Sequence, residues 1–216
     1  MNTDSIRQQM VEQQVRTWDV LDPEVLQTLR DIPRERYVPA EFADCAYADA
    51  EIPIGFGQVM FRPSLDGRIL QAVNIQPGES VLEVGTGTGY LTACISRLAA
   101  SVTSIDLHQS FLDAACKKLV EDTADNITLS QMDASAELPD DEFDVVIVSG
   151  SLPRQDDRLA TLLRPGGRLL TFIGESPAMT ATLISHDQAD ELNVRGLFES
   201  DVAPLVRTSE RSPFTF

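Results

Sequence analysis

Apolar residues repeat with two different spacings along this chain. Residues 4–18 space their apolar side chains as one face of a helix does, and residues 64–73 repeat that spacing. A further helix is expected to begin at Asp22-Pro23, because proline is favoured in the first helical turn. Residues 34–47 read as a short helical or irregular piece. The pattern therefore predicts a helical N-terminal part.

Beyond residue 79 the pattern of apolar residues changes to short apolar runs that alternate with segments of helical spacing. Strands are predicted at 80–85, 101–106, 127–133, 143–150 and 168–174, and helices at 90–99, 110–120 and 154–163. Strands that alternate with helices indicate an α/β fold with a parallel, doubly wound sheet. The most apolar run, 143–150, is expected at the centre of that sheet. The segments 179–185, 194–201 and 202–206 are expected to add two antiparallel strands.

A chain of 216 residues fits one domain with a sizeable core. We expect residues 1–216 to form a single domain in three parts. Residues 1–60 are a helical lead-in that ends in a glycine-rich loop, residues 61–175 the core, and residues 176–216 the C-terminal strands.

Charge and composition exclude several classes of function. The net charge of −17 disfavours nucleic acid as a partner, because phosphates require a basic face. No apolar run approaches the roughly 20 residues of a membrane helix, and the polar N-terminus does not read as a secretory signal, so we expect a cytoplasmic protein. His108 and His186 stand alone in polar surroundings, so we expect them to be exposed and predict no metal site.

The clearest motif is VLEVGTGTGY, which reads as strand, glycine loop and helix start. Its glycines are Gly85, Gly87 and Gly89, whereas a dinucleotide fingerprint would place the third glycine at position 90, which is Tyr90. Glu83 precedes the loop by two residues and suits an ammonium group better than a pyrophosphate. The pattern therefore favours S-adenosylmethionine over NAD, which leaves an oxidoreductase as a distant alternative.

Two acids follow the next strands. Asp106 ends the second strand, where a carboxylate can accept hydrogen bonds from both ribose hydroxyls, and Asp133 ends the third, within reach of the adenine amino group. Helix capping or solvation are the alternative roles for both. The candidate cofactor-binding residues are Glu83, Gly85, Thr86, Gly87, Gly89, Tyr90, Asp106, Leu107, Asp133 and Ala134.

Together with IPRERYVPAEF, EIPIGFGQ, FDVVIVSGSLP, LLRPGGRLL and VAPLV, this motif gives the chain a resemblance to the protein-L-isoaspartate O-methyltransferases over nearly its whole length. The resemblance implies a Rossmann-like methyltransferase sheet with a helical N-terminal addition and an altered strand order at the C-terminal end. It also implies a monomer. The implied substrate is a protein or peptide with an isoaspartyl residue, in a reaction of protein repair.

The implied reaction transfers a methyl group from S-adenosylmethionine to the α-carboxylate of the isoaspartyl residue. A carboxylate has a pKa near 4 and is already a nucleophile at neutral pH, so the site needs no general base. It need only align the reacting atoms and exclude water.

The chain departs from the family pattern at the acceptor loop, where the family has Gly-Gln-Thr, then Ile or Val, then Ser. Gln58 is kept, but the threonine position is Val59 and the serine position is Phe61. These three are the candidate catalytic residues, with both hydroxyls lost. We therefore expect cofactor binding to survive and isoaspartyl methylation to be weak, absent or redirected. The alternatives are a small-molecule acceptor and a cofactor-binding regulatory protein.

Overall fold

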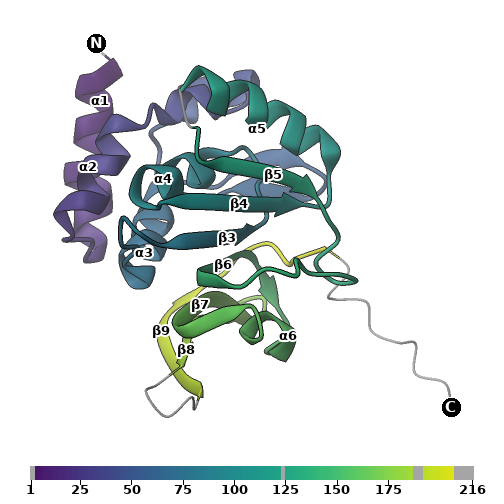
Figure 1. Cartoon of the computed structure of the whole chain (residues 1–216). Coiled ribbons are helices and arrows are strands. Elements are labelled where there is room, and N and C mark those ends of the chain that lie inside the picture. The colour runs from purple at the N-terminus through teal and green to yellow at the C-terminus, as the bar shows by residue number, and fades with distance from the viewer. Residues whose placement is uncertain (1–2, 123–124, 187–191, 207–216) are drawn as a thin grey trace, which may run out of the picture.

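The computed structural model describes residues 3–122, 125–186 and 192–206. Its centre is a seven-stranded sheet in the order β5-β4-β3-β6-β7-β8-β9, which runs from one edge of the molecule to the other in Figure 1. The strands are β3 (Ser80–Val84), β4 (Ser101–Asp106), β5 (Ile127–Gln131), β6 (Phe143–Leu152), β7 (Leu163–Glu175), β8 (Ala178–His186) and β9 (Leu192–Ser200). The first five pair in parallel, and β8 and β9 are antiparallel, as predicted.

The strand order reverses between β3 and β6, which are neighbours although β4 and β5 lie between them in sequence. Such a switch point opens a crevice at the carboxyl ends of the strands, where open α/β sheets bind their ligands. At the other end of the order, β7, β8 and β9 follow one another by antiparallel pairing, consistent with the altered order that the resemblance implied.

The N-terminal part is helical, as predicted. The segment 4–18 consists of α1 (Thr3–Met10), a π-helical turn (Val11–Val15) and a 3-10 turn (Arg16–Trp18). The next elements are α2 (Pro23–Asp31), two 3-10 turns (Arg34–Arg36 and Ala40–Cys45) and α3 (Pro63–Val73). Asp22 caps α2 by accepting hydrogen bonds from two backbone N–H groups of its first turn. None of the helices in these described stretches is long and apolar enough to cross a membrane.

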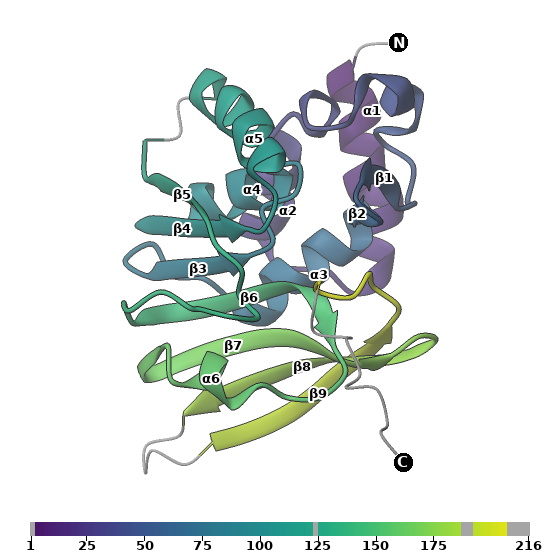
Figure 2. The ribbon, with the colours of Figure 1, turned by 90° about the vertical axis from the view of Figure 1, so that its right-hand side faces the viewer.

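The glycine-rich segment before α3 is a small hairpin rather than a loop. Strands β1 (Ile52–Gly55) and β2 (Gln58–Met60) pair antiparallel, and Figure 2 shows them apart from the seven-stranded sheet. The turn requires positive φ at three successive residues, +99° at Gly55, +53° at Phe56 and +72° at Gly57. The two glycines adopt this conformation at little cost, which explains why the turn lies between them.

Helices α4 (Tyr90–Leu98) and α5 (Gln109–Glu121) agree with the prediction, but the helix predicted at 154–163 does not. Only the four residues of α6 (Asp157–Ala160) are α-helical there. The segment ends early because Leu163 already pairs with Phe143 in the sheet. Pairing with β6 therefore overrides the local helical pattern.

The sheet separates two apolar cores. Alternate residues of β6 belong to different clusters: Val145 and Ile147 pack with α3, α4 and α5, whereas Val146 and Val148 pack with α6 and the segment after β5. The first cluster contains side chains from all three predicted parts of the chain, among them Met10. The division into three parts of one domain stays a prediction.

Residues 202–206 form no additional strand. Pro204 makes an isolated parallel bridge to Ser151, and the Leu205 N–H donates to the Ser151 carbonyl at 2.9 Å. These contacts bring the C-terminal segment, yellow in Figure 2, to the carboxyl end of β6. The two antiparallel strands expected of this region are β8 and β9.

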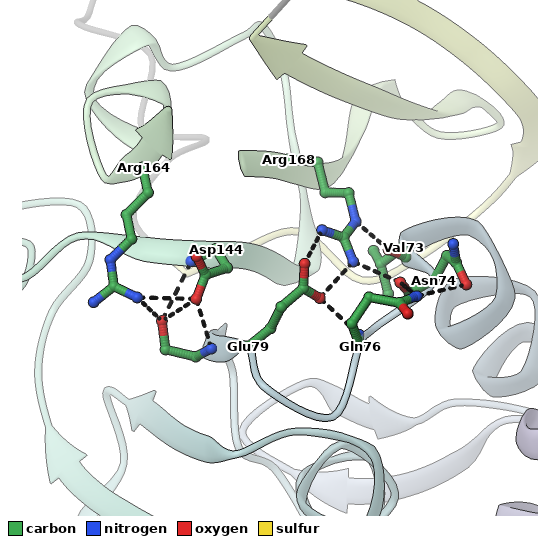
Figure 3. Close-up of polar contacts among 8 residues, drawn as sticks. Val73, Asn74, Gln76, Glu79, Asp144, Arg164 and Arg168 are labelled. Carbon is green, nitrogen blue, oxygen red and sulfur yellow. Dashed lines mark hydrogen bonds and ion pairs between the residues drawn. The ribbon is translucent and has the colours of Figure 1, made fainter. Parts of the chain in front are cut away.

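Ion pairs close the opposite, amino end of the sheet (Figure 3). Arg168 of β7 donates to both carboxylate oxygens of Glu79 at 2.8 Å and to the carbonyl of Asn74 at 2.7 Å. Arg164 binds Asp144 at 2.9 Å in the same region. Arg168 is thus held by the turn that precedes β3, and Arg164 by the beginning of β6.

Candidate active site

A single cavity lies at the carboxyl ends of β3, β4, β5 and β6. Its wall is formed by the glycine loop, the residues that follow β4 and β5, Ser149 of β6, the hairpin and the C-terminal segment. The empty space, including the open mouth, is about 840 Å³. Small-molecule sites are concave and mostly apolar with a few convergent polar groups, and this cavity has that character.

The glycine loop adopts backbone conformations that side chains disfavour. Gly85 and Gly87 have φ of +103° and +51°. A Cβ at Gly85 would lie 3.3 Å from Ser149, and one at Gly87 would lie 3.3 Å from Ile54 of the hairpin. The backbone N–H groups of this loop and of the start of α4 can therefore approach a ligand closely, and such groups bind carboxylates.

Gly89 has a different role from its neighbours. It does not line the cavity, and a Cβ there would lie 2.8 Å from the Cβ of Ala115 in α5. With φ at +84°, it lets α4 begin while α4 and α5 pack closely. The structure therefore supports a packing role for this predicted cofactor residue.

Glu83 lies behind the cavity wall and is fully buried. Its Oε2 accepts hydrogen bonds from Thr92 at 2.5 Å and Ser104 at 2.6 Å, and Ser104 in turn contacts Thr86 of the glycine loop at 2.6 Å. Burial raises the pKa of Glu83 to about 8, so it is mostly protonated at neutral pH. Its network supports the glycine loop, and its predicted contact with the ammonium group stays a prediction.

Asp106 joins the glycine loop to the residues that follow β4. Its Oδ2 accepts from the Gly87 N–H at 3.0 Å, and its Oδ1 accepts from the His108 N–H at 2.9 Å. Each carboxylate oxygen can accept a further hydrogen bond, and the residue lines the cavity. Asp106 is therefore held where it can receive two hydroxyls.

Asp133 follows β5 and also lines the cavity. Its Oδ1 accepts from the Ser135 hydroxyl at 2.6 Å and from the Ser135 N–H at 3.1 Å, which shapes the turn. The predicted cofactor residues that line the cavity are Gly85, Thr86, Gly87, Tyr90, Asp106, Leu107, Asp133 and Ala134. Two carboxylates and a glycine cradle, which added Cβ atoms would fill, fit S-adenosylmethionine.

The acceptor-loop residues Gln58, Val59 and Phe61 reach the same cavity from the hairpin. The Gln58 amide donates to the Pro204 carbonyl at 3.4 Å, so the hairpin touches the C-terminal segment. The Phe61 side chain is buried and meets the Phe172 ring edge-on, at 6.1 Å between centroids. The phenylalanine thus fills space at this end of the cavity.

Asp66, on the first turn of α3, lines the cavity although the sequence motifs did not single it out. Its Oδ2 accepts from Arg34 Nη1 at 2.8 Å, and both side chains are buried. A signal existed, because Asp66 begins the i, i+3, i+4, i+7 stripe of Ile69, Leu70 and Val73 that α3 buries. An acid in such a stripe is expected to be buried with a partner.

His108 lies at the cavity mouth and is half-buried, as His186 also is, so the expectation of exposed histidines was wrong. The rings of Phe56 and His108 stack 3.9 Å apart with 10° between their planes. Phe111 meets Phe56 edge-on at 5.5 Å. The hairpin tip therefore covers His108, which a sequence pattern does not reveal.

Comparison with known proteins agrees with this geometry. The family described as Protein-L-isoaspartate(D-aspartate) O-methyltransferase matches residues 5–210. A Protein-L-isoaspartate O-methyltransferase of Koribacter versatilis is 36% identical over 96% of this chain and 93% of its own length. One of Methylorubrum populi is 32% identical over 95% and 97%.

Among solved structures, a Plasmodium falciparum protein described as a protein-L-isoaspartate O-methyltransferase, in complex with S-adenosyl-L-homocysteine, has the same fold. Its TM-score is 0.80 at 19% identity, over 92% of this chain and 97% of the other. The cavity lies where the glycine loop meets the acceptor hairpin, and the matching segments extend along nearly the whole sequence. The chain belongs to the protein-L-isoaspartate O-methyltransferase family.

Proposed function

We propose that this protein transfers the methyl group of S-adenosylmethionine to the α-carboxylate of L-isoaspartyl residues in proteins or peptides. The observation that carries the proposal is that one cavity joins the glycine loop and Asp106 to the acceptor positions Val59 and Phe61. The names of its relatives support the choice of acceptor.

The chemistry requires few residues. The bound cofactor supplies a methyl group on a positively charged sulfur. Asp106 would receive the ribose hydroxyls, the glycine-loop N–H groups the cofactor's carboxylate, and Asp133 its adenine amino group. The acceptor oxygen forms the bond to the methyl carbon while the carbon–sulfur bond breaks, and no proton has to be removed from a carboxylate. The hairpin and the C-terminal segment exclude water from this step.

The test compares an isoaspartyl peptide with the same peptide containing ordinary aspartate. We expect S-adenosylhomocysteine to form with the first peptide and not with the second. Calorimetry with S-adenosylmethionine and with NAD reports cofactor binding separately. Binding of S-adenosylmethionine without turnover of the isoaspartyl peptide would refute the acceptor, whereas preference for NAD would refute the cofactor as well.

A second candidate is a small apolar acceptor, favoured by the buried ring of Phe61 beside Met60 and Val59. Replacing Val59→Thr together with Phe61→Ser restores the family's hydroxyls. Under the first proposal this double variant keeps or gains activity on the isoaspartyl peptide. If the double variant loses turnover of a small apolar acceptor and gains turnover of the peptide, the second candidate is the function of the wild-type protein. Cofactor binding without turnover of either would indicate a regulatory protein.

The remaining expectations concern partners and location. We infer a monomer that acts in the cytoplasm without nucleic acid, on the basis of the family resemblance and the net charge of −17. Size-exclusion chromatography with light scattering tests the monomer, and a mass of twice 23.7 kDa would contradict it.

A further inference from the structure

The acceptor loop supplies few hydrogen-bond donors to the cavity. Val59, Met60 and Phe61 line it with apolar side chains, and the Gln58 amide is directed to a backbone carbonyl. Beside them lies Asp66, whose side chain is 3% exposed. An ionised aspartate only accepts hydrogen bonds, whereas a protonated one also donates.

Asp66 is tied directly to the acceptor loop. Arg34 donates through Nη1 to Asp66 and through Nη2 to the carbonyl of Phe61, and its Nε donates to the carbonyl of Ala46 at 3.0 Å. The same guanidinium therefore fixes the aspartate beside the position where the family has its serine. Ser149, which also lines the cavity, lies instead against Gly85 of the cofactor loop.

The charges around the cavity are unfavourable for an additional carboxylate. The described lining residues include the three acids Asp66, Asp106 and Asp133 and no lysine or arginine. Arg34 is a nearby cation, and Asp66 already pairs with it. When two carboxylates meet in such a site, the pair holds one proton more readily than none.

We propose that Asp66, in its protonated form, donates the hydrogen bond that holds the acceptor carboxylate, in place of the hydroxyls absent at Val59 and Phe61. The inference rests on the proposed function. It assigns Asp66 as an acceptor-binding residue and makes methyl transfer depend on its protonation.

The surroundings of Asp66 fit this role. Burial raises the pKa of Asp66 to about 7, against the lowering influence of Arg34, so both forms exist near neutral pH. The other charged or titratable groups that face it are Asp49, Glu83, Tyr90 and Cys94. Burial raises the pKa of Tyr90 and Cys94 well above the ordinary values, so both stay neutral. Asp49 bonds the hydroxyl and N–H of Ser64 and adds negative charge that favours the proton on Asp66.

The experiment measures kcat/KM on an isoaspartyl peptide from pH 6 to pH 9, by S-adenosylhomocysteine release because methyl esters hydrolyse in alkali. For the wild type we expect kcat/KM to fall about tenfold per pH unit above pH 7, where Asp66 ionises. Asp66→Asn keeps an N–H donor at every pH while its carbonyl faces Arg34, so we expect activity with little slope. Asp66→Ala should lose at least about tenfold at pH 6.

Two further variants separate this role from a structural one. Val59→Thr leaves the Arg34–Asp66 pair intact and adds a hydroxyl, so it should flatten the fall above pH 7. Asp113→Asn, at an exposed aspartate of α5 outside the cavity wall, should keep the wild-type profile. Circular dichroism and calorimetry with S-adenosylmethionine confirm that each variant folds and binds cofactor.

The outcomes are distinct. An active wild type whose profile is flat, or whose profile Asp66→Asn and Val59→Thr both leave unchanged, would overturn the inference. So would full activity in Asp66→Ala at pH 6. No isoaspartyl transfer by any variant at any pH, with cofactor bound, would overturn the proposed function and this inference with it.

Discussion

Removing the ring of Phe56 should speed the exchange of cofactor. The ring is 62% exposed, yet it stacks on His108 and meets Phe111 edge-on, and both partners line the cavity mouth. Two residues earlier, in β1, Ile54 packs over Gly87. The hairpin thus packs against the cofactor loop and the start of α5 through these contacts, and we expect them to separate when a ligand leaves. We expect Phe56→Ala to weaken this packing.

The magnitude follows from the two ring pairs that this substitution removes. Each aromatic pair contributes about 0.5–1.5 kcal/mol beyond its buried area. Because more than half of the Phe56 ring is exposed, we take about 1–2 kcal/mol for the two pairs together. That corresponds to roughly 5- to 30-fold faster release of S-adenosylhomocysteine if opening of the hairpin limits release. Phe56→Gly removes the same ring. It also removes the backbone strain at φ of +53°, a conformation that costs a non-glycine residue on the order of 1 kcal/mol.

The assay is rapid-mixing displacement of radiolabelled S-adenosylhomocysteine by excess unlabelled ligand. The matched control is Leu21→Ala, because Leu21 is equally exposed at 64% and lies outside the cavity wall. A Phe56→Ala dissociation rate within twofold of wild type would refute the idea that these hairpin contacts slow release. A rate that rises equally in the Leu21 control would show that the effect is not local.

Three further predictions test the cofactor end. Asp106→Asn should weaken S-adenosylmethionine binding at least about tenfold in calorimetry, because an amide cannot accept at both oxygens as the carboxylate does; an unchanged Kd would contradict it. Gly89→Ala should lower the free energy of unfolding in urea by on the order of 1–3 kcal/mol, because the added Cβ would lie 2.8 Å from Ala115. At Gly78 an added Cβ would have no atom within 4 Å, so Gly78→Ala should cost less than about 1 kcal/mol. Glu83 has a raised pKa, so its contribution to stability is full below about pH 4.5 and is lost as pH rises toward 8. Glu83→Gln should therefore gain stability relative to wild type between pH 5 and pH 8, and a constant difference would refute this.

The parallel core could be predicted because its signals are local. The apolar runs of β3, β4 and β6 end at Gly85, Asp106 and Pro153, and each is followed by a loop that leads to a helix. Asp106 ends β4 and lines the cavity, as the end of a parallel strand leads one to expect, and its contact with the ribose stays a prediction. The pattern at 154–163 misled because its apolar residues suit either structure, and the neighbouring strand decides between them.

The acceptor end could not be predicted in the same way. Its polar residue, Asp66, is identified by a partner 32 residues away in sequence, Arg34, and by burial that only the packed structure provides. The spacing of Glu83 from the glycines does not show which way its side chain points. In the structure it lies behind the loop and accepts hydrogen bonds from Thr92 and Ser104, and its contact with the ammonium group stays a prediction.

Loss of the loop hydroxyls therefore has a more specific consequence than loss of activity. A carboxylate acceptor needs no base, so the missing side chains remove hydrogen-bond donors and leave the reaction itself unchanged. A hydroxyl donates at any physiological pH, but Asp66 donates only while it holds a proton. In a cavity wall with three acids, a protonated Asp66 also avoids the repulsion that an ionised one would exert on the acceptor. Replacing Thr and Ser by Val59 and Phe61 would thus turn a pH-independent acceptor site into one that works best on the acid side of neutrality.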